Sequence, residues 1–306
     1  MAGQIHNPHD RFMKSLLGDI HIARQYFEAF LPGHLKEILD LAKLEHSPNS
    51  FISDRLRETM ADIVLKCPLR ERNGEQLLYL NLLFEHKSTP YKFISIQIGG
   101  YLFDAYRDQV KNDQDPLIPV IPFLYYHGKD QWVPLKMDEL FDEPYLKTNE
   151  FIPSIKFLFE NIQNYSDDQI RQLSEGLLTS ALLTQKYTGE PELLAEKFNN
   201  IFSILESWQN RNLLESLIVY YFDIIVIEKN RLKNLVEKLP EVMKTEFISL
   251  ADQLRQEGRE EELNRKNWTA TKNMLLKGVD APFICDVLDV TPEFVKKVRK
   301  EMEAGN

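Results

Sequence analysis

The sequence predicts an α/β fold, followed by an all-helical subdomain and a short C-terminal helical module. Three observations lead to this prediction. Apolar residues at helical spacing open the chain, β-forming stretches frame a further helix over residues 60–128, and leucine-rich helical periodicity takes over beyond residue 153. The resulting order of α, β, β, α, β favours an α/β core over a sandwich or a bundle.

The helices of this core follow from apolar spacing. Residues 9–39 predict one or two amphipathic helices, in which apolar side chains recur near helical spacing at Phe12, Leu16, Ile20, Ala23, Phe27 and Phe30. Pro32 and Gly33 then break the pattern. A second helix is predicted over residues 92–111. The apolar run PLIPVIPFLYYHG, residues 116–128, predicts a central strand that is flanked by prolines and ends in a turn.

The stretch MADIVLKCPLRERNGEQLLYLNLLFEHKS, residues 60–88, predicts a β-hairpin. Its Asn73-Gly74 dipeptide suits a type I′ turn, which needs positive φ at both central residues. A two-residue loop there pairs residues whose numbers sum to 147, so Val64 faces Leu83 and Asp62 faces Glu85. In this register one face of the hairpin is wholly apolar, and the other carries both apolar and charged residues. A slip by one residue would move the carboxylates toward the apolar face.

The two opposed carboxylates need an explanation, because like charges on facing positions destabilise a sheet. Lys87 lies on the same face as Glu85 and offsets part of the repulsion. One interpretation is an ordinary ion-pair cluster at a sheet edge. The other is a Mg²⁺ site with Asp62, Glu85 and the backbone carbonyl of His86 as ligands, where Lys87 faces a phosphate or the attacking water. The second arrangement would suit phosphodiester hydrolysis.

Composition predicts three domains and a reducing environment. We expect the α/β core over residues 1–148, the helical subdomain over 149–248, and a charged helix with a helix-turn-helix-like module over 249–306. The net charge of −10 argues against bulk attraction to nucleic acid or membrane. Two cysteines without metal-binding spacing, no signal peptide and no membrane span predict a cytoplasmic protein. The apolar stretch 216–227 is read as a buried helix.

Several segments, in order, resemble a known family. HDRFMKSLL, FLPGHL, LRETMADIVLKC, LYLNLLFEHKS, ISIQIGGYLFDAY and PVIPFLYYHGKDQW occur at the spacing of the recombination-promoting nuclease family, also called YhgA-like transposases. The similarity spans roughly residues 8–245. The pattern of Asp, about twenty residues, then Glu-x-Lys also resembles the PD-(D/E)XK nuclease signature.

This resemblance implies a PD-(D/E)XK core, with a mixed sheet flanked by helices. It also implies a Mg²⁺-dependent DNA endonuclease, with Mn²⁺ as a substitute, that acts in recombination or mobile-element transposition. It implies catalytic roles for Asp62, Glu85 and Lys87, a substrate-orienting or water-orienting role for Gln97, and a further metal or supporting role for Asp10. The chain departs from the family at Lys87, where many members carry glutamine, so the lysine fits the wider nuclease pattern better.

Other residues have two interpretations. Tyr101 shares a helix face with Gln97 and either contacts DNA or, as we favour, packs on the sheet. His86 and His127 are read as a core histidine and a turn residue, and a metal cluster of His6, His9 and Asp10 is disfavoured. The C-terminal pair of helices either reads DNA or mediates packing or homo-oligomerisation, and its candidate DNA contacts are Lys296, Lys297, Arg299 and Lys300.

Two alternative functions stay open beside the nuclease. One is a nucleic-acid-binding or regulatory protein whose catalytic site has decayed, which predicts DNA binding without cleavage. The other is a scaffold whose helical half binds partner proteins, which predicts affinity for neither metal nor DNA.

Overall fold

The computed structural model describes residues 8–46, 63–70, 79–205, 210–225 and 229–304. They form two compact units, residues 1–243 and 244–306. In chain order the elements of the first unit are α1 (Pro8–Gly18), α2 (Ile20–Phe30), α3 (Gly33–Ile38), η1 (Leu41–Lys43), β1 (Glu45–His46), β2 (Ile63–Pro68), β3 (Tyr79–Lys87), α5 (Ile94–Lys111), β4 (Val120–Tyr126), η3 (Asp138–Leu140), η4 (Glu143–Phe151), β5 (Leu158–Asn161), η5 (Ile162–Asn164), α6 (Asp167–Leu173), α7 (Gly176–Lys186), α8 (Pro191–Glu196), α9 (Phe198–Phe202), α10 (Arg211–Ile224) and α11 (Lys229–Val236). The remaining elements are α12 (Glu241–Leu276), α13 (Ala281–Leu288) and α14 (Pro292–Ala304).

The sheet is mixed, as predicted, in the order β1-β2-β3-β4-β5. The β1–β2 and β2–β3 pairs are antiparallel, whereas the β3–β4 and β4–β5 pairs are parallel. The β2–β3 register confirms the prediction from Asn73-Gly74, with Ile63 opposite Phe84 and Val64 opposite Leu83. The turn itself and Asp62 lie outside the described residues. The fold is therefore mixed α/β, with most of its elements helical.

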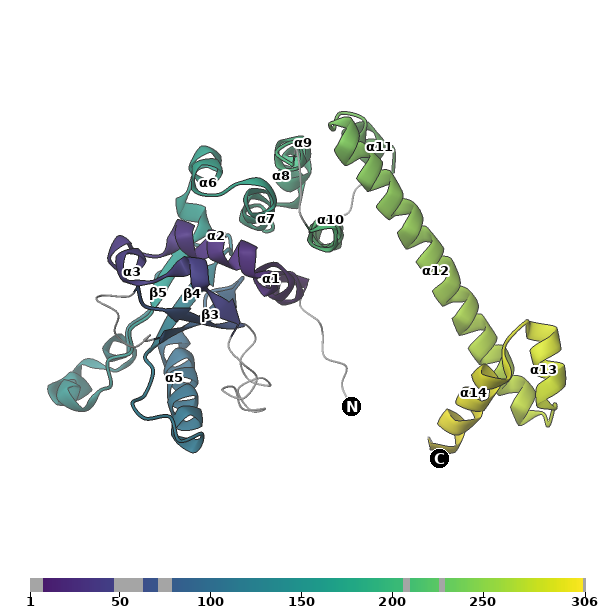
Figure 1. The fold of residues 1–306 in the computed structure, drawn as a ribbon, viewed down its shortest axis with the longest axis horizontal. Helices are drawn as coiled ribbons and strands as arrows, with labels where there is room; N and C mark the ends of the chain where they lie inside the picture. The colour runs from purple at the N-terminus through teal and green to yellow at the C-terminus, as the bar shows by residue number, and fades with distance from the viewer. Residues whose placement is uncertain (1–7, 47–62, 71–78, 206–209, 226–228, 305–306) are drawn as a thin grey trace. The chain divides into compact units, whose positions relative to one another are not determined.

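Helices cover the sheet on both sides. Phe123 of β4 packs its ring against Tyr26 and Phe27 of α2, at centroid distances of 5.6 and 5.7 Å. Leu124, the next residue, packs against Ile94 and Ile98 of α5. Because successive strand residues point to opposite faces, we call these the α2 face and the α5 face of the sheet. Figure 1 shows α1 and α2 on one side of the sheet and α5 on the other.

Local sequence sets the ends of the first helices. Asp19 separates α1 from α2, because its side chain caps α2 by accepting hydrogen bonds from the backbone N–H groups of His21 and Ile22. The apolar side of α1 is buried through Phe12, Met13, Leu16 and Leu17. The amphipathic spacing in the sequence therefore predicted this pair of helices correctly.

Residues 149–248, predicted to be all helical, also contribute a strand. Beyond β5, which pairs parallel to β4, the segment is helical in its described part, from α6 to α11. Ser166 and Gln169 form a capping box at the start of α6. The apolar stretch 216–227 is a buried helix, as predicted, as far as Ile224, where α10 ends; it buries Leu217, Ile218 and Tyr221. Residues 226 and 227 lie outside the described part of the chain. No helix in the described part of the chain is both long and apolar enough to span a bilayer.

Asp167 ties α6 to its neighbours. Its carboxylate accepts hydrogen bonds from Lys186 and Lys197, each at 2.8 Å, and from the hydroxyl of Tyr187. Burial alone would raise the pKa of this carboxyl, but the three donors outweigh burial and lower the pKa. The ionised form of Asp167 therefore stabilises the folded protein.

We expect Asp167→Asn to lower the free energy of unfolding at pH 7 by roughly 2 to 3 kcal/mol, because it removes charge-assisted hydrogen bonds. A carboxyl whose folded pKa is depressed contributes stability above its unfolded pKa and loses it as the pH falls through the folded value. The difference between the native protein and the variant should therefore shrink in urea unfolding below the ordinary pKa of 3.8. If Asp167→Asn lowered the free energy of unfolding equally at pH 7 and below pH 3.8, the result would contradict this role of the ionised carboxylate.

The second unit holds the predicted charged helix and the C-terminal helix pair. Thr291 caps α14, since its side-chain oxygen accepts from the backbone N–H of Phe294 at 3.2 Å. Ile284 of α13 and Val295 and Val298 of α14 are buried. The predicted start of the last helix at Thr291-Pro292 is confirmed.

Candidate active site

The carboxyl ends of β3 and β4 meet at one edge of the sheet. In their parallel register Glu85 pairs with Leu124 and Lys87 pairs with Tyr126. Paired residues of neighbouring strands share a face, so Glu85 and Lys87 occupy register positions on the α5 face. The Glu-x-Lys motif therefore lies at the end of a strand, beside the first turns of α5.

Lys87 is the last residue of β3 and is half-buried. Its carbonyl accepts a hydrogen bond of 3.1 Å from the backbone N–H of His127, which ties the strand end to the residue after β4. Its ammonium nitrogen lies 6.0 Å from the centroid of the Tyr91 ring. The sheet thus fixes the backbone of Lys87, while the side chain of Lys87 remains partly exposed to solvent.

Asp10 reaches the same edge from α1. Its Oδ1 lies 3.2 Å from Nδ1 of His86, and its side chain is 38% exposed. The hydrogen bond from His86 is the main cause that lowers the pKa of Asp10, and the charges of Lys14 and Lys87 act in the same direction. Asp10 is therefore an ionised carboxylate within electrostatic reach of Lys87.

His86 points away from the α5 face, as strand alternation predicted. Its imidazole is buried and stacks on that of His127, with ring centroids 4.6 Å apart and planes 8° apart. The interpretation as a hydrogen-bonded core histidine is confirmed. As the residue between Glu85 and Lys87, it ties the motif to α1 through Asp10.

His9 and His127 complete a histidine cluster that sequence reasoning missed. The His9 ring centroid lies 4.8 Å from that of His127, and Nδ1 of His9 is 2.8 Å from the hydroxyl of Tyr220. His127, which follows β4 and was predicted to be a turn residue, is buried, and its Nδ1 is 3.0 Å from Oγ1 of Thr188. Burial lowers the pKa of His9 to about 4, and burial likewise holds the pKa of His127 well below its ordinary value. Both imidazoles are consequently neutral at pH 7.

The helical region holds α1 in place beside this cluster. Phe12 stacks on Tyr220 of α10 with ring centroids 4.1 Å apart, and Arg11 pairs with Asp223 at 2.6 Å. These two residues directly follow Asp10 in α1. The motif HDRF therefore connects the edge of the sheet to α10.

Gln97 and Tyr101 share a face of α5, as their spacing predicted. The side-chain amide of Gln97 donates a hydrogen bond to the hydroxyl of Tyr101. Tyr101 is buried and packs with Val120, which is the packing role that we favoured over DNA contact. Gln97 is half-buried.

The remaining predicted metal ligands are described incompletely. Asp62 and the side chain of Glu85 lie outside the described part of the structure. Among the side chains that are described, no group of three or more His, Cys, Asp or Glu is arranged to hold a metal ion. The two predicted ligands that are described, the ionised carboxylate of Asp10 and the backbone carbonyl of His86, are hard oxygen groups of the kind that Mg²⁺ prefers.

The four basic residues predicted to contact DNA lie together on one element of the second unit. Lys296, Lys297, Arg299 and Lys300 are carried by α14, and we call them the α14 basic cluster. Their apolar neighbours Val295 and Val298 are buried. The helix therefore turns its charges to solvent and its valines inward.

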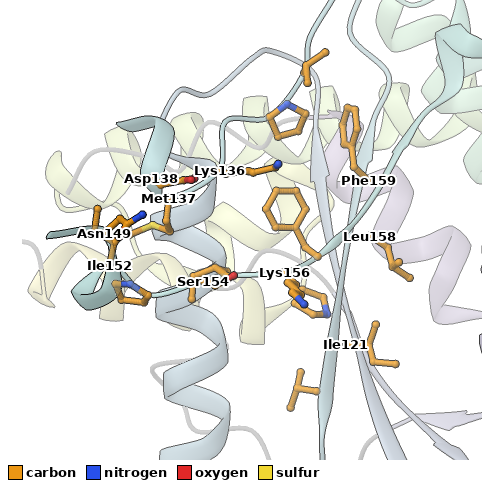
Figure 2. Close-up of a pocket in the computed structure, with 17 residues that line it drawn as sticks. Ile121, Lys136, Met137, Asp138, Asn149, Ile152, Ser154, Lys156, Leu158 and Phe159 are labelled. Atoms are coloured by element: carbon orange, nitrogen blue, oxygen red, sulfur yellow. The ribbon is translucent and has the colours of Figure 1, made fainter. Parts of the chain in front are cut away.

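A cavity of about 970 Å³ lies at the other end of β4. It is lined by Val120–Pro122 at the start of this strand, by the segment before β5, and by charged residues that include Lys136, Asp138 and Lys156 (Figure 2). Neither Lys87, Gln97 nor Asp10 lines it. The cavity is thus separate from the candidate active site.

Comparison with known proteins agrees with the motifs. The family model described as "Putative transposase, YhgA-like" matches residues 7–215. The inactive recombination-promoting nuclease-like protein RpnE of Escherichia coli K12 is 26% identical over 259 residues, which cover 83% of each chain. The recombination-promoting nuclease RpnA of the same strain is 25% identical over 84% of this chain and 86% of the relative, and RpnC is 30% identical over 54% of each. No solved structure matches the chain.

Proposed function

Because the chain belongs to the YhgA-like transposase family, we propose that it is a metal-dependent DNA endonuclease with a PD-(D/E)XK core, acting in recombination or mobile-element transposition. The β2–β3 register is the observation that carries this proposal. The confirmed pairs run up to Ile63 and Phe84. Asp62 lies outside the described residues, and the same register would place it opposite Glu85. The order of helix, three antiparallel strands, helix and parallel strand also supports the proposed core.

In this proposal Asp62, Glu85 and the backbone carbonyl of His86 hold Mg²⁺ or Mn²⁺, with Asp10 as a further ligand or a supporting group. When bound, the metal supplies a Lewis acid that lowers the pKa of a bound water and neutralises phosphate charge. The residues of the chain do the rest. The positive charge of Lys87 faces the phosphate and the attacking water. Gln97 orients either the substrate or this water.

The histidine cluster supports this site without acting on the substrate. His86 holds Oδ1 of Asp10 at 3.2 Å, which leaves the second carboxylate oxygen for other partners. The neutral rings of His9 and His127 avoid adding two positive charges beside Asp10 and Lys87. We therefore assign the histidine cluster a positioning role.

Cleavage of supercoiled plasmid in the presence of Mg²⁺ tests the proposal. We expect the native protein to nick the plasmid and Glu85→Gln to lower the rate by about 100-fold or more, because a ligand charge is removed while the shape is kept. Glu196→Gln, at an exposed position of α8, should behave as the native protein. Equal nicking by all three would indicate a contaminating nuclease and contradict the proposal.

A decayed nuclease that still binds nucleic acid is the second candidate, since RpnE, which resembles this chain over most of its length, is named as inactive. In that case the native protein would bind DNA without nicking it in either Mg²⁺ or Mn²⁺. Binding and cleavage measured on the same preparation separate the two functions.

The α14 basic cluster is our candidate for DNA contact in both cases. Replacing its four residues by serine should weaken binding of the full chain to duplex DNA without metal. The slope of log affinity against log salt should shrink by up to roughly 0.9 for each phosphate that the variant no longer neutralises. Serine at two exposed lysines elsewhere, Lys147 and Lys238, is the control. An unchanged affinity and slope in the cluster variant would exclude α14 from the DNA interface.

A further inference from the structure

Helix α5 turns an apolar stripe to solvent. The stripe consists of six exposed positions spaced three and four residues apart along α5 and its N-cap residue: Phe93, Ile96, Gly100, Phe103, Arg107 and Val110. The four large apolar side chains are 43%, 51%, 60% and 63% exposed at Phe93, Ile96, Phe103 and Val110, respectively. We call these six residues the α5 stripe.

This stripe departs from the usual pattern of a helix that packs on a sheet. The opposite side of α5 already contributes to the core through Ile94, Ile98 and Leu102. A helix with one buried side normally carries polar residues on the other, and a helix that is apolar all round is normally covered. The alternation of three and four is also the spacing of the contact seam in a coiled coil. The α5 stripe therefore has the pattern of a helix-pairing surface.

We propose that a second copy of this chain packs its own α5 antiparallel on the α5 stripe, forming a two-fold symmetric dimer. Such an interface must be complementary to itself, because both copies contribute the same residues. In the antiparallel register whose partners sum to 203, Phe103 of each copy faces Gly100 of the other. A Cβ built on Gly100 meets no atom within 4 Å, so there is open space above it for an aromatic ring.

The same register matches the rest of the α5 stripe. Phe93 faces Val110 of the second copy, and Ile96 faces Arg107. The guanidinium of Arg107 already pairs with Asp104 in its own chain. Its aliphatic stem can cover Ile96 of the second copy, and its charge lies one turn from the ring of Phe93, a favourable cation–π partner.

A parallel pairing of the two helices fits less well. Each residue would then face its own copy, which would put two Arg107 charges together and leave a gap where two Gly100 residues meet. Like charges and unfilled space both destabilise a helix pair. The distribution of residues along the α5 stripe thus favours the antiparallel dimer.

Sedimentation analysis across the micromolar range tests the dimer. We expect the native full-length chain to be dimeric, and Phe103→Lys to raise the dimer dissociation constant by about 100-fold or more, because a charge is placed at the centre of an apolar interface. Leu117→Lys, at an exposed apolar residue outside the stripe, should leave the dimer intact. A monomeric native protein, or a dimer that Phe103→Lys does not weaken, would overturn the proposal.

Disulfide trapping tests the orientation and does not depend on the Phe103 variant. Phe93→Cys and Val110→Cys are each introduced into a Cys285→Ser background, which leaves the buried Cys67 as the other thiol. Mixing the two variants under oxidation should give a linked dimer, whereas each alone should not, since identical positions lie about 25 Å apart along the antiparallel pair. Linkage of each variant with itself would indicate parallel helices, and no linkage in any sample would contradict the interface.

Discussion

Lys87→Ala is expected to lower the rate of DNA cleavage by about 100-fold to 1,000-fold, the range seen when one preorganised electrostatic group is removed from a transition state. Lys87 ends β3, and its backbone is tied to the residue after β4 by the hydrogen bond from His127. Its amine is the cation that follows Glu85 at the spacing needed to share the α5 face. In the proposed mechanism its removal would leave phosphate charge uncompensated without disturbing the sheet.

Two variants make this result specific. Lys92→Ala removes an exposed lysine five residues further on, whose ammonium lies over the ring of Phe93, and it should cleave as the native protein does. Lys87→Arg keeps the charge and should retain more activity than Lys87→Ala. The thermal midpoint of Lys87→Ala should stay close to that of the native protein, because the side chain is half-buried. A fully active Lys87→Ala would remove Lys87 from the site.

Phe123→Ala is expected to cost about 3 to 5 kcal/mol of unfolding free energy, because it opens a cavity under α2. Phe123 is 1% exposed in the interior strand β4, and its ring contacts those of Tyr26 and Phe27. Folded domains are stabilised by only about 5 to 15 kcal/mol, so this loss is a large share of the total. Thermal melting followed by circular dichroism should show a midpoint lower by about 10 °C or more.

Phe151→Ala is the matched control. Phe151 ends η4 and is 79% exposed, so its removal opens no cavity and should change the unfolding free energy by no more than about 0.5 kcal/mol. If Phe123→Ala and Phe151→Ala lowered the free energy of unfolding equally, β4 would not be the centre of the core.

The hairpin shows how much of the fold could be predicted from the sequence. Its register follows from two local facts, a turn dipeptide that needs positive φ and an apolar face that a slip would expose. Both act within one pair of neighbouring strands. The β2–β3 register was therefore predictable, and so was the helix that follows it.

The strand β5 was harder to foresee. Its four residues, Leu158–Asn161, alternate too briefly to stand out from their surroundings. Their strand conformation depends on the parallel pairing with β4, which is more than thirty residues away in the sequence. A stretch so short is decided by its tertiary partner rather than by its own propensity.

In the candidate site, too, local features could be predicted from the sequence and long-range contacts could not. Glu85 and Lys87 could be singled out because one strand carries both, and His86 between them alternates to the other face as expected. The contacts of His86 with Asp10 and of His127 with Thr188 join residues 76 and 61 positions apart. No local pattern encodes them, although the motifs HDRF, FEHKS and YYHG each contain one histidine of the cluster.

Whether the carboxylates of Asp62 and Glu85 bind a divalent ion, as we propose, is tested most directly by thermal melting with and without Mn²⁺. A ligand that binds only the folded state stabilises it by about 2.7 kcal/mol at 100 times its dissociation constant. We predict that Mn²⁺ raises the melting temperature of the native protein and leaves those of Asp62→Asn and Glu85→Gln unchanged. The same rise in all three proteins, or no rise in the native one, would contradict the proposed metal site.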